Sequence, residues 1–186
     1  MINLSVCPWQ AGPILTSKFR KMFHDPVKIT GPYLSAGMTV MDIGCGFGFF
    51  TIPMSDIVGK HGKVVAVDLQ QGMLNGLDKN IADKGNDNIT AQLCEYNTLR
   101  IQQWNGAIEF ALIFYMLHEV RDKERFIQEI YDVLAPSGKV LFSEPFLHVS
   151  RNNFQKSLGI FYRIGFEAID TPDIPVSRAV ILQKKS

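Results

Sequence analysis

The sequence predicts an α/β fold in which a doubly wound, mostly parallel sheet of seven strands has an antiparallel last strand and a short helical N-terminal cap. Short apolar runs alternate with longer amphipathic runs along most of the chain, and that alternation is typical of parallel sheets with helical crossovers. One strand-like run ends in a glycine-rich loop. The last two strand-like runs have no helix between them, so we expect them to form an antiparallel edge.

Strands are expected where short apolar runs lie between turn residues. These runs are residues 39–43, 63–68, 89–94, 107–114, 139–143, 166–169 and 179–182. The near-continuous apolar character of residues 107–114 indicates a central strand covered on both faces. Helices are expected where apolar residues recur with a helical period, at residues 49–58, 73–84, 123–134 and 153–164. Gly85, residues 136–138 and Gly165 are placed to end the last three of them.

Length and composition limit the class of protein. The chain has 186 residues, of which 46% are hydrophobic and 20% charged, and these values are typical of one globular domain rather than a disordered or fibrous chain. A formal net charge of +1 does not favour a dedicated nucleic-acid binder. No secretory signal is visible, and the longest apolar run is far shorter than the roughly 20 residues of a membrane span. We therefore expect a cytoplasmic protein with no membrane partner.

Cysteines and histidines do not suggest a disulfide framework or a metal site. Cys7, Cys45 and Cys94 are odd in number and form no C-x-x-C pair, so reduced thiols are expected. The H-E-V-R-D segment that begins at His118 has no second histidine at the i+4 spacing of a helical zinc site. The sequence therefore predicts no bound metal.

Residues 1–36 differ from the rest of the chain in charge and in proline content, and we expect them to form a cap or lid over a domain of residues 37–186. Pro26 after Asp25 is typical of a first helical turn with an aspartate N-cap. Four cations stand against Asp25 alone in this region: Lys18, Arg20, Lys21 and Lys28. The cluster formed by the first three is interpreted as a solvated helix face, with an anion site as the alternative.

The most informative segment is V-M-D-I-G-C-G-F-G-F-F-T, residues 40–51. A predicted strand there runs into Gly44, Gly46 and Gly48, and a helix begins directly after them. Glycines in such a loop allow a tight turn and let a ligand approach the backbone closely. Asp68 ends the next predicted strand twenty residues after Gly48, where a carboxylate can accept hydrogen bonds from ribose hydroxyls. This layout indicates a nucleotide-type ligand.

The spacing of the glycines separates the nucleotide classes. A dinucleotide-binding loop needs a third glycine at position 49, which is Phe49, and a P-loop needs Gly-Lys-Ser/Thr, which Phe49-Phe50-Thr51 does not match. Asp42 precedes the glycines, and a carboxylate there repels a pyrophosphate but attracts an ammonium group. S-adenosylmethionine (SAM) carries both an ammonium group and a sulfonium. The charge pattern therefore favours SAM.

The segments D-I-G-C-G-F-G and V-V-A-V-D resemble motif I and the following acidic motif of the class I SAM-dependent methyltransferases. A-P-S-G-K-V-L-F-S-E-P is similar to the fifth-strand motif of that family, and the resemblance covers roughly residues 38–182. The most similar subgroup is the small-molecule type related to the ubiquinone and menaquinone C-methyltransferases, also called methyltransferase type 11 proteins. The resemblance implies a Rossmann-like fold, SAM as cofactor, and methyl transfer to a small-molecule acceptor.

The resemblance also implies which residues hold SAM. Asp42 and the glycine loop would line the methionyl arm and the ribose, and Asp68 would hold the ribose with Leu69. Glu95 stands where the family usually has an aspartate near the adenine. The implied cofactor-binding residues are Asp42, Gly44, Cys45, Gly46, Gly48, Asp68, Leu69, Met73, Glu95, Tyr96 and Phe114. The family often has an aspartate entering the fourth strand, where this chain has Glu109.

Candidates for catalysis follow the fourth and fifth predicted strands, because such folds place ligands at the carboxyl ends of their strands. His118, next to Glu119, has the residue type to deprotonate or orient an acceptor. Its alternative is a structural histidine bonded to a neighbouring carboxylate. Glu144 and His148 are further catalytic candidates, and their alternative is support of the sheet edge.

Two aromatic residues are candidates for the acceptor site. Tyr115 would form a wall of the pocket, because aromatic faces attract a sulfonium. Trp9 lies in the N-terminal segment that commonly covers the acceptor site in this family, and it is an amphipathic contact residue.

The sequence leaves the acceptor open. Residues 114–117 read F-Y-M-L instead of the Asn-Pro-Pro-Tyr-like tetrad of amine-methylating enzymes, which argues against adenine or glutamine amines. RNA or protein stays an alternative acceptor, with the basic N-terminal cluster as its contact surface, although no recognition module is present. A nicotinamide-dependent oxidoreductase and a SAM-binding protein without catalysis also remain as alternatives. The oligomeric state, monomer or homodimer, is open.

Overall fold

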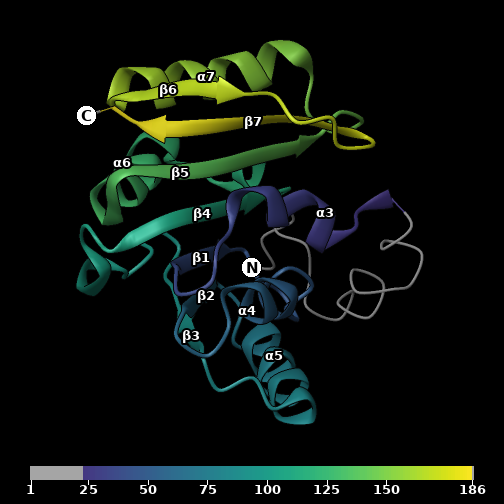
Figure 1. Ribbon diagram of the computed structural model, residues 1–186. Coiled ribbons are helices and arrows are strands. Elements are labelled where there is room, and N and C mark those ends of the chain that lie inside the picture. Colours follow the sequence, from purple (N-terminus) through teal and green to yellow (C-terminus); the bar gives the residue numbers. More distant parts are fainter. Residues whose placement is uncertain (1–22, 186) are drawn as a thin grey trace.

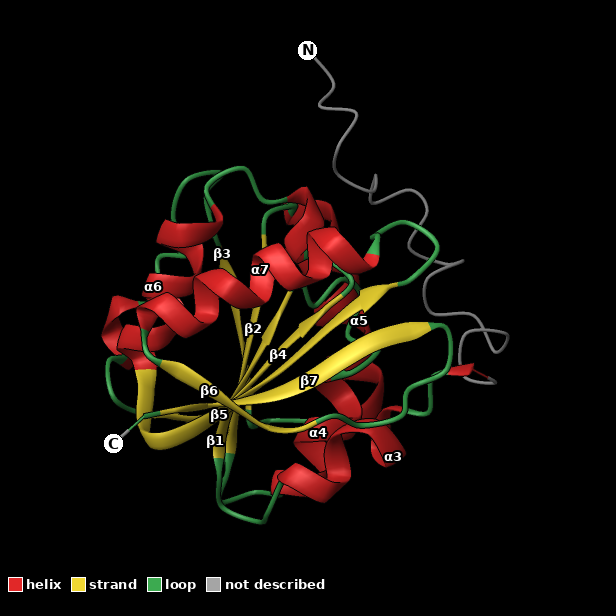
Figure 2. Ribbon diagram, turned by 90° about the horizontal axis from the view of Figure 1, so that it is seen from above, coloured by secondary structure: helices red, strands yellow, loops and turns green. Residues whose placement is uncertain are grey.

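The computed structural model describes residues 23–185, and these form a seven-stranded sheet with helices on both faces (Figures 1 and 2). The strand order is β3-β2-β1-β4-β5-β7-β6. The first five strands in this order are parallel, and β7 is antiparallel to both of its neighbours. The predicted fold class is therefore confirmed. Across residues 23–185, no helix is both long and apolar enough to cross a membrane.

The elements alternate as the sequence predicts. The strands are β1 Thr39–Ile43, β2 Lys63–Asp68, β3 Ile89–Leu93, β4 Ile108–Phe114, β5 Leu134–Pro145, β6 Phe166–Asp170 and β7 Ser177–Lys184. The helices are α3 Pro26–Thr30, α4 Thr51–Val58, α5 Gln71–Lys84, α6 Lys123–Val133 and α7 Arg151–Ile164, with short 3₁₀ helices η2 Gly31–Tyr33, η3 Gln102–Trp104 and η4 Leu117–Glu119.

Local signals end and begin several of these helices. The Asp25 carboxylate caps α3 by accepting hydrogen bonds from the backbone N–H groups of Val27 and Lys28, and Pro26 stands in the first turn. Gly85 ends α5 in the left-handed region, at a φ of 73°, which a residue without a Cβ adopts at little cost. Both features confirm the predictions made from the sequence.

Most predicted boundaries lie within two residues of the observed ones, and the largest error is at the start of β5. Residues 136–138 were expected to form a turn before a strand at 139–143, but β5 already begins at Leu134, directly after α6. Leu134 pairs with Ile108 of β4, and the register shifts before Phe110 pairs with Lys139. A Cβ on Gly138 would lie 2.9 Å from the Ile108 carbonyl oxygen, so glycine is needed here for close strand pairing rather than for a turn.

The two faces of the sheet carry separate hydrophobic cores. Helices α6 and α7 cover one face, where Ile130 and Phe161 pack with Met41 and Val65. Helices α3 and α4 cover the other face with apolar residues such as Ile29 and Met54, and α5 packs beside them on β2. Every residue of β4 except Glu109 is buried, as predicted for a central strand. This rigid sheet brings the carboxyl ends of β1 to β5 to one edge.

Candidate active site

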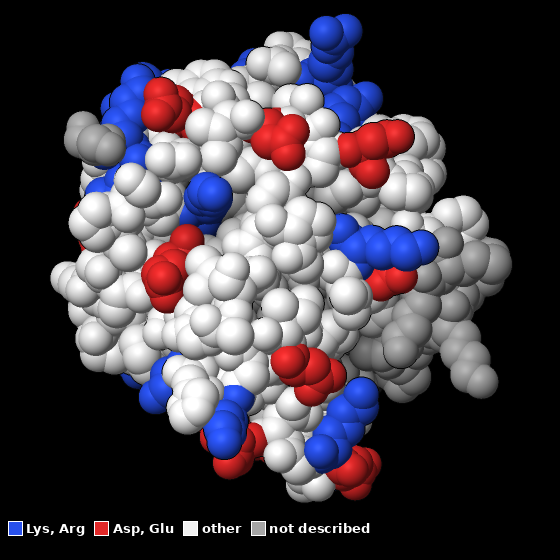
Figure 3. Space-filling view, in the orientation of Figure 1, with Lys and Arg blue, Asp and Glu red and all other residues white. Residues whose placement is uncertain are grey.

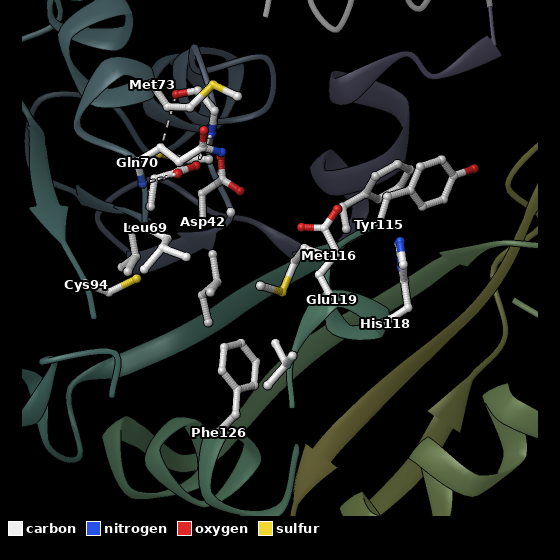
Figure 4. A pocket seen from close by; sticks show the side chains of 18 of the residues that line it. Asp42, Leu69, Gln70, Met73, Cys94, Tyr115, Met116, His118, Glu119 and Phe126 are labelled. Carbon is white, nitrogen blue, oxygen red and sulfur yellow. Dashed lines mark hydrogen bonds between the residues drawn. The ribbon is translucent and has the colours of Figure 1, made fainter. Parts of the chain in front are cut away.

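A cavity of about 600 Å³ opens at the carboxyl ends of the parallel strands (Figure 4). It is lined by the segments that follow β1, β2, β3, β4 and β5, together with His24 just before α3. Its size is ordinary for a small-molecule or cofactor site. The described residues contain no group of three or more His, Cys, Asp or Glu side chains that could hold a metal ion.

The glycine loop is shaped by the backbone. Gly44, Gly46 and Gly48 have φ values of 78°, 54° and 87°, which favour glycine. Gly44 and Gly46 line the cavity, whereas Gly48 does not. Gly48 instead packs against α5, because a Cβ there would lie only 2.5 Å from Leu77 Cδ1. Gly48, which the resemblance implies for cofactor binding, thus lies against the helix behind the cavity lining.

Asp68 fixes this loop from the next strand. Its Oδ2 accepts a hydrogen bond from the Gly46 N–H at 2.9 Å, and its Oδ1 accepts one from the Gln70 N–H at 2.9 Å. Burial raises the pKa of Asp68, while the hydrogen bonds from backbone N–H groups oppose that shift. Each oxygen has lone-pair capacity beyond its backbone bond. Asp68 is therefore a rigid acceptor that faces the cavity.

Asp42 is the second buried carboxylate of this end, with 3% of its surface exposed. Its Oδ2 accepts a hydrogen bond of 2.6 Å from Thr51 Oγ1, at the start of α4. It lines the cavity beside the glycine loop. A buried negative charge in this place attracts a positively charged group of a ligand.

Apolar and aromatic side chains surround the far end of the cavity, next to β3. Leu69 after β2, Met73 of α5 and Cys94 after β3 line this end from three segments (Figure 4). Glu95 also lines the cavity, but its carboxylate forms an ion pair with Arg100. The guanidinium of Arg121 lies 5.2 Å from the ring centroid of Tyr96. This end can hold a flat, largely apolar group.

His118 and Glu144 form a pair at the opposite end. Glu144 Oε2 lies 2.6 Å from His118 Nδ1, and Glu144 Oε1 accepts the His118 backbone N–H at 2.8 Å. The Glu144 side chain is 3% exposed and lies behind His118, outside the cavity lining, whereas His118 lines the cavity. The bond to Glu144 raises the pKa of His118, although burial opposes that shift. With Nδ1 engaged by Glu144, Nε2 is the ring nitrogen that an acceptor can use.

Tyr115 and His24 close the cavity on the α3 side. Tyr115 has a φ of 63°, and its hydroxyl lies 3.0 Å from His24 Nε2 and also contacts Ser177. His24 Nε2 lies 3.0 Å from the Pro175 carbonyl oxygen, and the His24 ring packs edge-on against Phe114 and Tyr115. The contacts of His24 and Tyr115 thus join segments that are distant in the sequence.

Most of the residues named from the sequence meet in this one cavity. Its lining includes Asp42, Gly44, Cys45, Gly46, Asp68, Leu69, Met73, Glu95, Tyr96, Phe114, Tyr115, His118 and His148. Trp9 lies outside the described residues. Sequence reasoning missed His24, Gln70, Cys94, Met116 and Phe126, and it gave Glu119 no role. A histidine directly before an aspartate N-cap was the one local feature at His24, and it carried no sign of a cavity.

Comparisons with known proteins agree with this geometry. A family model described as "Methyltransferase domain" matches residues 34–164. The demethylmenaquinone methyltransferase of Lactobacillus johnsonii is 32% identical over 122 residues, which are 66% of this chain and 48% of that protein. The ubiquinone/menaquinone biosynthesis C-methyltransferase UbiE of Escherichia coli is 32% identical over 136 residues, which are 69% of this chain and 53% of that protein. The chain spans about half the length of these curated relatives.

The fold is also found among solved structures. A SAM-dependent methyltransferase from Aquifex aeolicus has a TM-score of 0.86 at 23% sequence identity, over 96% of this chain and 99% of that one. The family match covers most of the chain, and it includes the glycine loop, Asp68 and His118. The chain therefore belongs to the methyltransferase domain family and has the class I SAM-dependent fold.

Proposed function

We propose that this chain is a SAM-dependent methyltransferase that transfers a methyl group to a small-molecule acceptor of quinone type. The observation that carries the proposal is one cavity with two different ends. Asp68 and the glycine loop lie at one end, and His118 on a buried Glu144 lies at the other. The relatives' names, demethylmenaquinone methyltransferase and ubiquinone/menaquinone biosynthesis C-methyltransferase, support the quinone class.

The residues of the cofactor end fit SAM. Asp68 can accept the ribose hydroxyls, since both of its oxygens are fixed by backbone N–H groups and face the cavity. Asp42 suits the ammonium group of the methionyl arm, and the apolar surfaces of Leu69 and Met73 suit the adenine. SAM, when bound, supplies a methyl group that is already activated by the sulfonium.

Alignment is then the main task of the protein. Holding the two reactants in line contributes up to about 7–11 kcal/mol in favourable cases. His118 would take a proton from the acceptor through Nε2, and the buried Glu144 carboxylate at Nδ1 would stabilise the imidazolium that forms. Glu144 thus acts through His118. His148 and Tyr115 would contact the acceptor from the ends of β5 and β4.

We further propose that residues 1–36 cap the acceptor end of a SAM-binding domain of residues 37–186. His24 supports this proposal, because it reaches the cavity from the segment before α3. We also place the protein in the cytoplasm, which is consistent with free thiols at Cys45 and Cys94. On the face seen in Figure 3, the basic and acidic side chains of the described residues are interspersed, which does not favour a nucleic-acid acceptor.

The test is a transfer assay with the whole chain, methyl-labelled SAM, and a panel of reduced naphthoquinones and benzoquinones that lack one ring methyl group. We expect a methylated product, one methyl group heavier by mass spectrometry, and an equal amount of S-adenosylhomocysteine. The matched variant His118→Asn should bind SAM but form little product. SAM binding without turnover across the panel would contradict the quinone class and favour a SAM-binding protein without catalysis.

A further inference from the structure

The cavity crosses the sheet in the order of its strands, and this order assigns a place to each part of the ligand. From β3 through β2 and β1 to β4 and β5, the lining passes from Glu95 to Asp68, then Asp42, and finally His118. If SAM binds as proposed above, its adenine and ribose lie toward β3 and β2 and its methionyl arm toward β1. The reactive sulfur then lies between the β1 and β4 ends, next to the acceptor.

Glu119 stands at this junction. It ends the short helix η4, where its backbone N–H donates a hydrogen bond of 3.0 Å to the Met116 carbonyl oxygen. The neighbouring Leu117 is fully buried and anchors the turn. The Glu119 side chain is half-buried and lines the cavity. In Figure 4 its carboxylate is directed toward the space between Asp42 and Tyr115.

The charge of the ligand changes at this point during the reaction. SAM carries a positive sulfonium, whereas the product, S-adenosylhomocysteine (SAH), has a neutral sulfur in the same place. The ammonium group that suits Asp42 and the ribose that suits Asp68 are the same in both molecules. A negatively charged side chain close to the sulfur therefore distinguishes substrate from product by electrostatics.

We propose that Glu119 is a specificity-determining residue that favours SAM over SAH and so promotes release of the product. Its carboxylate would attract the sulfonium and lose that attraction once the methyl group has been transferred. Glu119 directly follows His118 in η4, and both line the cavity, which places it on the acceptor side of the cofactor. The inference rests on the proposed function, because it requires SAM to bind in this cavity.

The experiment is a calorimetric titration of the whole chain with SAM, with SAH and with sinefungin. Sinefungin has a carbon-borne ammonium group in place of the sulfonium, so it keeps the positive charge without a transferable methyl group. The test variant is Glu119→Gln, which keeps the shape of the side chain and removes its charge. The matched control is Glu95→Gln, which removes a carboxylate from the adenine end of the same cavity.

We expect Glu119→Gln to weaken the binding of SAM and sinefungin by roughly five- to twentyfold, which is the size expected for the loss of one partly buried charge pair. The binding of SAH should weaken by less than about twofold. Glu95→Gln should leave the ratio of SAM to SAH affinity unchanged. Because His118 lies beside Glu119, the same comparison is repeated in a His118→Gln background, where the change in the ratio should persist.

Three results would overturn the inference. Equal weakening of SAM and SAH would mean that Glu119 acts on the shared ammonium group or on the fold. Loss of the effect in the His118→Gln background would mean that Glu119 acts only through the histidine. Failure of the wild-type chain to bind either ligand would remove the proposed function together with this inference, whereas the first two results leave the function intact.

Discussion

The two ends of the cavity are formed by different kinds of chemical group. At the cofactor end, backbone groups of a glycine loop are fixed by Asp68, and the partners lie on neighbouring strands of one β-α-β unit. At the acceptor end, side chains from distant segments meet, as when His24 contacts Pro175 and Tyr115 contacts Ser177. The comparison suggests that substitutions at the first end change affinity for the cofactor, whereas those at the second change turnover and acceptor binding.

The largest expected effect comes from the acceptor end. We expect His118→Asn to lower kcat by roughly 10²–10⁴-fold, the usual contribution of a general base, with SAM affinity nearly unchanged. Steady-state kinetics and calorimetry on the same preparation would measure both quantities. His148→Asn is the comparison variant, because His148 lines the same cavity but its ring is not the one that Glu144 holds, so its loss of kcat should be smaller. A large loss of SAM binding in His118→Asn would contradict the separation of the two ends.

At the cofactor end, Asp68→Asn should weaken the binding of SAM by roughly 100-fold. The reason is that an amide has one acceptor oxygen for two backbone N–H groups and the ribose. The comparison variant Glu95→Gln should weaken SAM binding much less, because the Glu95 carboxylate is exposed and paired with Arg100. Fluorescence or calorimetric titration measures the SAM affinity of both variants. Similar losses in the two variants would mean that the fixed carboxylate of Asp68 has no special part in binding.

Gly48→Ala tests the backbone of the same end. We expect it to lower the free energy of unfolding by about 2–4 kcal/mol, from a left-handed φ together with an overlap with Leu77. The control Gly85→Ala changes a glycine in the left-handed region, at a φ of 73°, with no atom within 4 Å of the added Cβ, so it should lower the free energy of unfolding by the conformational part alone, about 1–2 kcal/mol. Equal losses in denaturant unfolding would argue against close packing of the loop on α5.

Glu144→Gln tests the pH dependence of the acceptor end. Glu144 raises the pKa of His118 above 6.5, so neutral His118, the form that accepts a proton, forms only at a pH above that value. The variant should shift the acid limb of the kcat profile to lower pH. Because the folded-state pKa is raised, the pair stabilises the fold fully below pH 6.5 and loses this contribution as the pH rises through the folded-state pKa.

The difference in unfolding free energy between the wild type and Glu144→Gln should therefore be larger at pH 6 than at pH 9. An unshifted kcat profile would mean that His118 does not titrate as the base.

The smallest expected effect is that of Tyr115→Phe. We expect a loss of about 0.5–1.5 kcal/mol in stability, the usual contribution of a hydrogen bond, and a modest rise in KM for the acceptor. Tyr33→Phe is its control, because the Tyr33 hydroxyl donates to Asp170 at 2.8 Å and lies outside the cavity lining. Burial and this bond together raise the pKa of Tyr33 to about 12. A similar rise in KM in both variants would mean that the effect of Tyr115→Phe does not arise at the acceptor site.

The contrast between the two ends also explains what the sequence could predict. The predicted bounds of β1 and β2 are confirmed, because both strands are buried apolar runs that stop at a glycine loop or at Asp68. The glycine loop and Asp68 were found for the same reason, since local spacing specifies them. The start of β5 was misplaced, because Pro136 and Gly138 indicate a turn unless pairing with Ile108 is known.

The acceptor end depends on contacts that local patterns do not record. Glu144 was named from its place after a strand, but its position behind His118 depends on how β5 lies beside β4. His24 contacts a residue 151 positions away, so no short motif could identify it. Sequence reasoning therefore named many of the residues that line the glycine-loop end of the cavity and fewer of those that line the other end.

One calorimetric experiment tests the central claim, that the chain binds SAM through a cofactor end that works independently of the acceptor end. S-adenosylhomocysteine and NADH are titrated into the wild type, Asp68→Asn and His118→Asn. We expect one equivalent of S-adenosylhomocysteine to bind the wild type and His118→Asn with similar affinity. Asp68→Asn should bind it roughly 100-fold more weakly, and NADH should not bind. Binding of NADH alone, or equal loss in the two variants, would contradict the account.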